Sequence, residues 1–199
     1  MIGIIDYGLG NIKAYHNIYK EHDIDLKIIS NYKDINSKID KLILPGIGSF
    51  DNALTLLKSK NFFDEIINFS LNSKNKILGV CVGMQILSRA SEEGNLEGLS
   101  IVKENFKKLP SKILPHIGWN SVTINREIDI LENITKDCFF YFLHSYALLN
   151  KSSDIKICET SYEIKFISVY QKENIYGIQF HPEKSHTQGS QILLNFYNS

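Results

Sequence analysis

The stretch from residue 77 to residue 87 constrains the fold of this chain most. It reads Ile-Leu-Gly-Val-Cys-Val-Gly-Met-Gln-Ile-Leu, so an apolar run is followed by a cysteine between two glycines and then by an amphipathic pattern. This order predicts a strand, a sharp turn and a helix. Gly79 and Gly83 have no Cβ atoms, so the strand and the helix can approach closely and the turn can hold Cys81 in strained backbone angles. Cys81 is then placed as a nucleophile, and the alternative is a small buried cysteine on a core strand.

Strands that alternate with helices predict an α/β fold with a doubly wound sheet and flanking helices. Apolar runs predict strands at residues 2–5, 26–30 and 41–44. Helical periodicity follows at residues 12–19, 50–57 and 62–71. In such a sheet, ligands bind at the carboxyl ends of the strands. Both Cys81 and the Pro-Gly-Ile-Gly loop of residues 45–48 follow predicted strands, so we expect them to lie at the same edge.

The second half of the chain is richer in short strand-like runs. These runs are residues 99–104, 121–124, 138–143, 155–159, 166–171 and 175–180. No Gly/Ser-rich linker separates the two halves, and 199 residues suit one well-packed core. We therefore expect a single domain over residues 1–199, with a β-rich C-terminal half.

Composition argues against several classes of function. The 22 basic and 22 acidic side chains balance, so no overall field attracts nucleic acid or an anionic membrane. No apolar run approaches membrane-spanning length. Three cysteines leave one unpaired in any disulfide scheme, which favours a reducing, cytoplasmic location. The six histidines lack paired ligand spacing, so we expect no metal and no cofactor.

A second candidate for chemistry is the sequence His181-Pro182-Glu183, which follows the predicted strand at residues 175–180. Pro182 stiffens the turn, so the two flanking side chains are placed as a base and the carboxylate that orients it. An isolated His-x-Glu is more often a solvent-exposed turn. Together with Cys81 it predicts a Cys-His-Glu triad.

Six stretches of the chain, in order, resemble the class I, triad-type glutamine amidotransferases, and within them the glutaminase subunits of imidazole glycerol phosphate synthase. They are residues 6–11, 45–50, 79–87, 115–120, 141–146 and 179–185. The resemblance implies the fold of that family, a flavodoxin-like mixed sheet. It also implies hydrolysis of the glutamine side-chain amide to glutamate and ammonia through a thioester on Cys81, with His181 and Glu183 completing the triad.

The same resemblance nominates residues for binding. The oxyanion would be held by the Val82 N–H and by the loop residues Gly46, Ile47 and Gly48. Glutamine would be held by Gly48, Gln85, Glu93, Ser145 and Tyr146. Val82 stands where the family more often has leucine, which is a mild change because its backbone N–H is the functional part.

The resemblance also implies a partner, because ammonia would pass to a separate (β/α)8-barrel cyclase in histidine biosynthesis. This chain has neither the length nor the repeats for such a barrel. The residues expected near the docking face are Asn11, Pro115, His116, Gly118, Trp119, Asn120 and Lys184. The unusual segment Lys103-Glu104-Asn105 leaves an alternative acceptor open, a surface-polysaccharide sugar that a different barrel amidinates. A catalytically dead, regulatory subunit is a further alternative.

Overall fold

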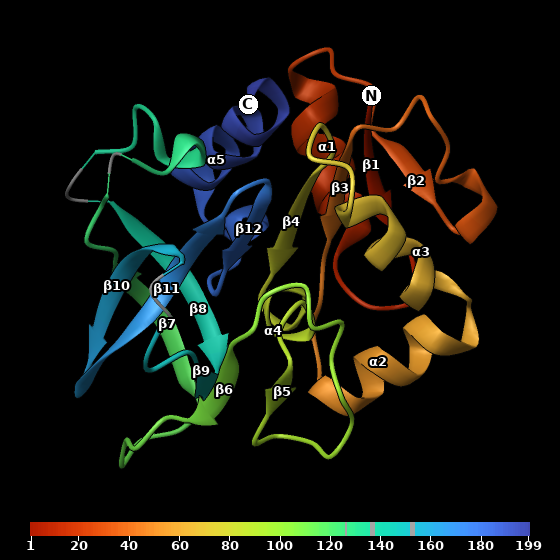
Figure 1. Ribbon diagram of the computed structural model, residues 1–199. Helices are drawn as coiled ribbons and strands as arrows, with labels where there is room; N and C mark the ends of the chain where they lie inside the picture. Colours follow the sequence, from red (N-terminus) through yellow and green to blue (C-terminus); the bar gives the residue numbers. More distant parts are fainter. Residues whose placement is uncertain (126, 136–137, 152–153) are drawn as a thin grey trace.

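The computed structural model describes residues 1–125, 127–135, 138–151 and 154–199 (Figure 1). Its largest sheet follows the order β10-β11-β12-β4-β3-β1-β2. The strands from β12 to β2 are parallel, whereas β10, β11 and β12 pair antiparallel. The expected α/β fold with a mixed sheet is therefore confirmed. The bounds are β1 (Ile2–Ile5), β2 (Lys27–Ile29), β3 (Lys41–Leu44), β4 (Lys76–Val80), β10 (Lys156–Tyr162), β11 (Ile164–Lys172) and β12 (Ile175–Ile178).

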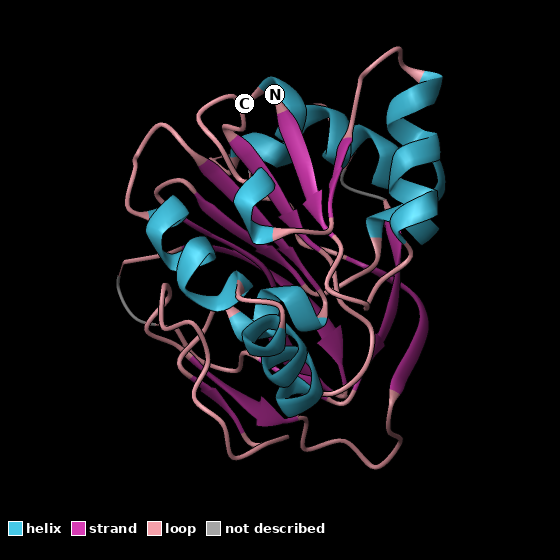
Figure 2. Ribbon diagram, turned by 90° about the vertical axis from the view of Figure 1, so that its right-hand side faces the viewer, coloured by secondary structure: helices cyan, strands magenta, loops and turns pink. Residues whose placement is uncertain are grey.

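Helices flank this sheet on both sides (Figure 2). They are α1 (Ile12–Glu21), α2 (Phe50–Ser59), α3 (Phe62–Ser70), α4 (Val82–Ile86) and α5 (His186–Asn198), with short 3₁₀ turns η1 (Tyr32–Asp34), η2 (Asp129–Leu131) and η3 (Pro182–Lys184). Each long helix buries one apolar stripe, as an amphipathic sequence requires. On α1 the buried side chains are Tyr15 and Tyr19, and the Tyr19 hydroxyl donates to the Leu193 carbonyl, which joins α1 to α5.

Two small sheets complete the second half of the chain. One contains β5 (Ala90–Ser91), β6 (Asn105–Lys108) and β9 (Tyr146–Ala147), and the other pairs β7 (His116–Ser121) with β8 (Phe139–His144). An isolated bridge between Tyr141 and His181 ties β8 to the turn that follows β12. The β7–β8 hairpin therefore sits beside the carboxyl edge of the large sheet.

Two of the expected strands are wrong. Residues 99–104 are not a strand, because the N–H groups of Leu99 and Val102 pair with the carbonyls of Ile86 and Leu87 at the end of α4, and Ser100 has a positive φ of 54°. Of residues 121–124, only Ser121 belongs to a strand.

The carboxyl ends of three neighbouring parallel strands bring the candidate residues together. In the register of the sheet, Gly79 lies beside Leu44 and Val80 lies beside Ile178. The loop of residues 45–48, Cys81 and the segment 179–183 therefore emerge side by side at one edge.

Within the described ranges, no helix is both long enough and apolar enough to cross a membrane.

Candidate active site

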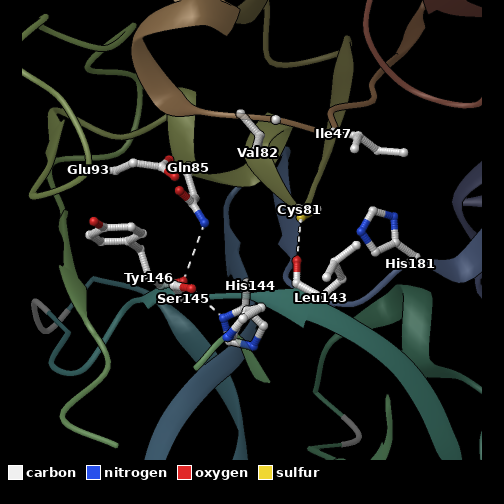
Figure 3. A pocket seen from close by; sticks show the side chains of 12 residues that line it. Ile47, Cys81, Val82, Gln85, Glu93, Leu143, His144, Ser145, Tyr146 and His181 are labelled. Carbon is white, nitrogen blue, oxygen red and sulfur yellow. Dashed lines mark hydrogen bonds between the residues drawn. The ribbon is translucent and has the colours of Figure 1, made fainter. Parts of the chain in front are cut away.

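Cys81 stands on a sharp turn between β4 and α4. Its φ of 54° and ψ of −112° lie outside the regions that a residue with a Cβ favours, so the strain expected at this position is confirmed. The side chain faces a pocket but is only 4% exposed (Figure 3). Val82 is the first residue of α4, so its N–H has no partner within the helix and can serve a ligand at the turn.

The two glycines around this turn allow β4, α4 and the end of β3 to touch. A Cβ on Gly83 would collide with the carbonyl oxygen of Leu44, and a Cβ on Gly79 would lie 2.6 Å from the carbonyl oxygen of Gly83. Neither position tolerates a side chain without moving the backbone. The close packing fixes Cys81 relative to the loop of residues 45–48.

His181 and Glu183 form a buried pair on the neighbouring strand end. Nδ1 of His181 lies 2.9 Å from Oε1 of Glu183, and both side chains are 1% exposed. Because a carboxylate only accepts, Nδ1 carries the proton and Nε2 is left to face other groups. Nε2 is buried and has no hydrogen-bond partner in the part of the chain that is described. It is therefore available to a substrate or to Cys81.

The protonation of His181 is set by opposing effects. Burial alone would lower the pKa of His181, but the charges of Cys81 and Glu183 and the hydrogen bond to Glu183 outweigh it and raise this pKa to about 10. The ring is then an imidazolium at neutral pH, close to Cys81 and oriented by the Glu183 carboxylate. This is the charge arrangement that a Cys-His nucleophile needs.

A chain of side-chain amides runs from the pocket wall to the sulfur. The carbonyl of Tyr146 can only accept, so Gln85 must face it with its nitrogen, at 3.4 Å. The same nitrogen donates to Oε1 of Gln179, also at 3.4 Å. The nitrogen of Gln179 therefore faces Sγ of Cys81, at 3.7 Å. Oε1 of Gln85 is buried and has no hydrogen-bond partner among the described residues, so it can accept from a ligand.

The pocket in front of Cys81 has a volume of about 180 Å³. This volume suits a ligand of amino-acid size. Side chains from both halves of the chain line it (Figure 3). They are Ile47, Gly48, Cys81, Val82, Gln85, Glu93, Pro115, Leu143, His144, Ser145, Tyr146 and His181.

Most of the expected oxyanion and substrate residues thus surround one cavity. Gly46 does not line it and lies behind it, where an added Cβ would be 2.7 Å from the Gly83 nitrogen. Oε2 of Glu93 accepts from the Phe50 N–H at the start of α2, at 2.9 Å. Partial burial raises the pKa of Glu93 despite this hydrogen bond, and the charge of Asp51 adds to the rise. Among the described residues, this hydrogen bond uses only one oxygen of the Glu93 carboxylate, and Glu93 lines the pocket.

Two buried histidines, His116 and His144, form hydrogen bonds that support the pocket wall at Tyr146. Nδ1 of His144 lies 3.0 Å from the Tyr146 carbonyl and must donate to it, so Nε2 of His144 accepts from Nδ1 of His116, at 3.0 Å. Burial lowers the pKa of His116 to about 4 and that of His144 to about 3. Both rings are neutral at pH 7. Their hydrogen bonds hold Tyr146 in place and make them structural groups.

The residues expected at a partner face fall into two groups. Trp119 is 45% exposed on the outer face of β7, where it stacks on His186 with ring centroids 4.9 Å apart. Lys184 is exposed, with its Nζ 5.4 Å from the Tyr141 ring centroid. By contrast, His116 is only 2% exposed, so its side chain cannot touch a partner directly. Exposed positions also include Asn11 and Pro115, and partly exposed ones include Gly118 and Asn120.

Sequence reasoning missed two side chains that contact Cys81 or Glu183. One is Gln179, and its signal was a polar residue in the apolar run that precedes His181. The other is Tyr15, whose hydroxyl donates to Oε2 of Glu183 at 2.9 Å. On the apolar face of a helix, Tyr15 looks like ordinary core, so no local pattern marks it.

Comparisons with known proteins agree with this geometry. The family described as Glutamine amidotransferase class-I matches residues 3–199. An imidazole glycerol phosphate synthase subunit HisH from Leptospira borgpetersenii is 41% identical over 202 residues, which covers 98% of each chain. The corresponding subunit from Caldanaerobacter subterraneus is 40% identical, covering 98% of this chain and 97% of the relative.

Solved structures share the fold at lower identity. A crystal structure of a glutamine amidotransferase superposes with a TM-score of 0.78 at 13% identity, covering 100% of this chain and 98% of that one. A structure of PurLQS from Thermotoga maritima gives a TM-score of 0.78 at 16% identity, covering 99% and 97% of the two chains.

Proposed function

Because the chain belongs to the class I glutamine amidotransferases, we propose that it is the glutaminase subunit of an imidazole glycerol phosphate synthase, with Cys81, His181 and Glu183 as its triad. One observation supports the assignment of the triad: the buried His181–Glu183 pair lies beside the strained Cys81. Cys81 and His181 both line one pocket of amino-acid size. The relatives named HisH support the choice of enzyme.

The proposed reaction has two halves. The Cys81 thiolate attacks the side-chain amide carbon of glutamine, and N–H groups of Val82 and of the loop at residues 46–48 stabilise the oxyanion. The His181 imidazolium gives its proton to the leaving nitrogen, and ammonia departs. His181 then removes a proton from water as the water attacks the thioester, which releases glutamate and restores Cys81. Glu183 keeps the ring oriented in both halves.

Glutamine is proposed to bind with its two charged groups away from Cys81. The other oxygen of Glu93 would accept from the ammonium group, and Ser145 and Tyr146 would supply donors for the carboxylate. The unpaired Oε1 of Gln85 would accept a hydrogen bond from the substrate. Gly48 would line the oxyanion side of the cavity.

We further propose that the partner is a (β/α)8-barrel cyclase that docks on the exposed face of the β7–β8 hairpin. This face carries large exposed apolar side chains, of which Ile117 is 56% exposed, Trp119 45% and Phe139 55%. Such side chains are typical of a protein interface. Asn11, Pro115 and Lys184 would surround them. His116, Gly118 and Asn120 alternate with Ile117 and Trp119 along β7 and would support it from the opposite face, where Asn120 contacts His116. The cytoplasmic location expected from the sequence stays a prediction.

The alternative acceptor, a surface-polysaccharide sugar, is not favoured because the relatives carry the name of the histidine-pathway enzyme. The catalytically dead alternative does not account for an intact triad.

The test is ammonia release from glutamine by the purified chain, alone and with the barrel cyclase plus its ribulosyl ligand. We expect strong stimulation by the pair, and loss of activity in Cys81→Ser and His181→Ala. Cys138→Ser is the matched control, because Cys138 is equally buried but contacts Thr135 instead of the pocket. Near wild-type ammonia release by Cys81→Ser would contradict the assignment of Cys81 as the nucleophile. Basal turnover that the cyclase does not stimulate would indicate a different acceptor for the ammonia.

A further inference from the structure

We propose that Tyr15 is a positioning residue of the triad, and that its hydroxyl fixes the Glu183 carboxylate and thereby the ring of His181. The proposal rests on the function proposed above for the triad. The two oxygens of Glu183 are divided between two donors. Oε1 accepts from Nδ1 of His181 and Oε2 accepts from the hydroxyl of Tyr15, each at 2.9 Å. A carboxylate held at both oxygens cannot rotate without losing a hydrogen bond.

Burial makes this contact necessary. Tyr15 is 1% exposed and the side chain of Glu183 is also 1% exposed, so bulk water cannot replace the hydroxyl. An ionised carboxylate in such a place needs donors for its remaining lone pairs. Without Tyr15, Oε2 would lose the donor that it has in this structure.

The hydroxyl is a donor at every relevant pH. Burial raises the pKa of Tyr15 well above its usual value, and the charge and hydrogen bond of Glu183 raise it further. The titratable groups that act on Tyr15 are Glu183 and Cys81 from the triad and Tyr19 from the same helix. Tyr15 therefore stays neutral, and it spreads part of the Glu183 charge onto a phenol instead of onto the imidazolium alone.

Tyr19 offers a matched control. It lies one turn further along α1, it is also buried, and its hydroxyl donates to the Leu193 carbonyl at 2.9 Å instead of to the triad. Tyr15→Phe and Tyr19→Phe therefore each delete one buried hydroxyl from the same helix. Only the first deletion touches Glu183.

The kinetic experiment compares these variants in the full chain with its cyclase partner. Tyr15→Phe should lower kcat for glutamine hydrolysis about tenfold, which is the loss expected for one hydrogen bond to a charged group. KM should stay unchanged, because Tyr15 does not line the pocket. In a Glu183→Gln background the same substitution should cause a clearly smaller loss, since the carboxylate that it orients is gone. Equal kcat values for Tyr15→Phe and wild type, or an undiminished loss in the Glu183→Gln background, would overturn the proposal.

A second readout does not depend on activity. In ¹⁵N-labelled chain, the Nδ1 proton of His181 reports the hydrogen bond to Glu183 directly. We expect its resonance to shift or broaden in Tyr15→Phe and to stay in place in Tyr19→Phe. An unchanged resonance in Tyr15→Phe rejects the positioning role. If the wild-type chain released no ammonia, the proposed function would fail while this measurement still decided the role of Tyr15.

Discussion

The side-chain nitrogen of Gln179 lies 3.7 Å from the sulfur of Cys81, and the hydrogen bonds of Gln85 leave it no other orientation. Gln179 is fully buried, so its N–H is a fixed dipole that faces the sulfur. A donor in this position stabilises a thiolate more than a thiol. The amide chain therefore connects the pocket wall at Tyr146 with Cys81, the proposed nucleophile.

Gln179→Met should slow the chemistry of Cys81. The substitution keeps the side-chain length but removes the N–H donor, so the thiolate loses one hydrogen bond. We expect alkylation of Cys81 by iodoacetamide at neutral pH to slow about tenfold. Mass mapping of the alkylated peptides measures the rate, and the buried Cys138 and Cys158 serve as internal references.

Gln171→Met is the control for this substitution. Gln171 is also a buried glutamine and lies in β11, but its amide pairs with the Glu173 carbonyl and the Tyr176 hydroxyl. It should leave the alkylation of Cys81 unchanged. Equal rates in the two variants would argue that Gln179 does not act on the sulfur.

The raised pKa of His181 predicts a loss of stability at alkaline pH. The pKa is about 10 in the folded chain and 6.5 for an unperturbed histidine. The folded state therefore holds its proton more tightly, so this contribution to the free energy of unfolding is complete below pH 6.5 and is lost as pH rises toward 10. Urea unfolding across this window should show a steeper decline for wild type than for His181→Gln. In Cys81→Ser the decline should be smaller, because the charge of Cys81 is part of the cause.

The buried histidines predict the opposite behaviour at acid pH. Burial lowers the pKa of His144 from 6.5 to about 3, so the unfolded chain binds a proton that the folded chain does not. The stability associated with neutral His144 is present above pH 6.5 and is lost as pH falls toward 3. Comparing urea unfolding of wild type and His144→Asn at neutral and acid pH tests this. The variant should lose less stability on acidification, and the exposed His22→Asn should behave as wild type.

Gly83→Ala should disrupt the turn between β4 and α4 that carries Cys81. A Cβ there meets the Leu44 carbonyl, which is backbone and cannot rotate away. We expect a loss of about 3 kcal/mol in the free energy of unfolding. Gly8→Ala is the comparison, because its φ of +105° is unfavourable but its Cβ would meet nothing within 4 Å. Gly8→Ala should lower the free energy of unfolding by about 1 kcal/mol. An equal loss in both variants would contradict a clash with the Leu44 carbonyl as the cause of the Gly83→Ala effect.

The parts of the candidate site that could be predicted from sequence are those encoded locally. The nucleophile turn follows from two glycines around Cys81, and the pair His181 and Glu183 follows from one stiff turn. The alternation of strands and helices was enough to place Cys81 and the loop of residues 45–48 at one edge of a parallel sheet. That His181 follows a strand paired with β4 came only from the structure. Each of these signals lies within a dozen residues.

Contacts between distant segments could not be predicted in this way. Tyr15 and Glu183 are 168 residues apart in the chain, and nothing near Tyr15 distinguishes a triad contact from ordinary core. Residues 99–104 look like a strand, but tertiary hydrogen bonds to the end of α4 override the pattern. The real strand β7 contains Gly118 at a φ of +127°, which a propensity argument takes for a turn.

Trp119→Ala should weaken binding of the cyclase partner. The indole is 45% exposed and is held by its stacking on His186 and by an edge contact with Tyr141, so it is an ordered aromatic anchor that presents one face outward. Central aromatic anchors of this kind contribute at least about 2 kcal/mol to an interface, which corresponds to a loss of about thirtyfold in affinity. Leu71→Ala is the control, because Leu71 is a 78% exposed apolar side chain that follows α3, outside the β7–β8 hairpin. Calorimetric titration with the cyclase measures the affinity of both variants. Unchanged affinity in Trp119→Ala would show that the cyclase does not dock on the β7–β8 hairpin.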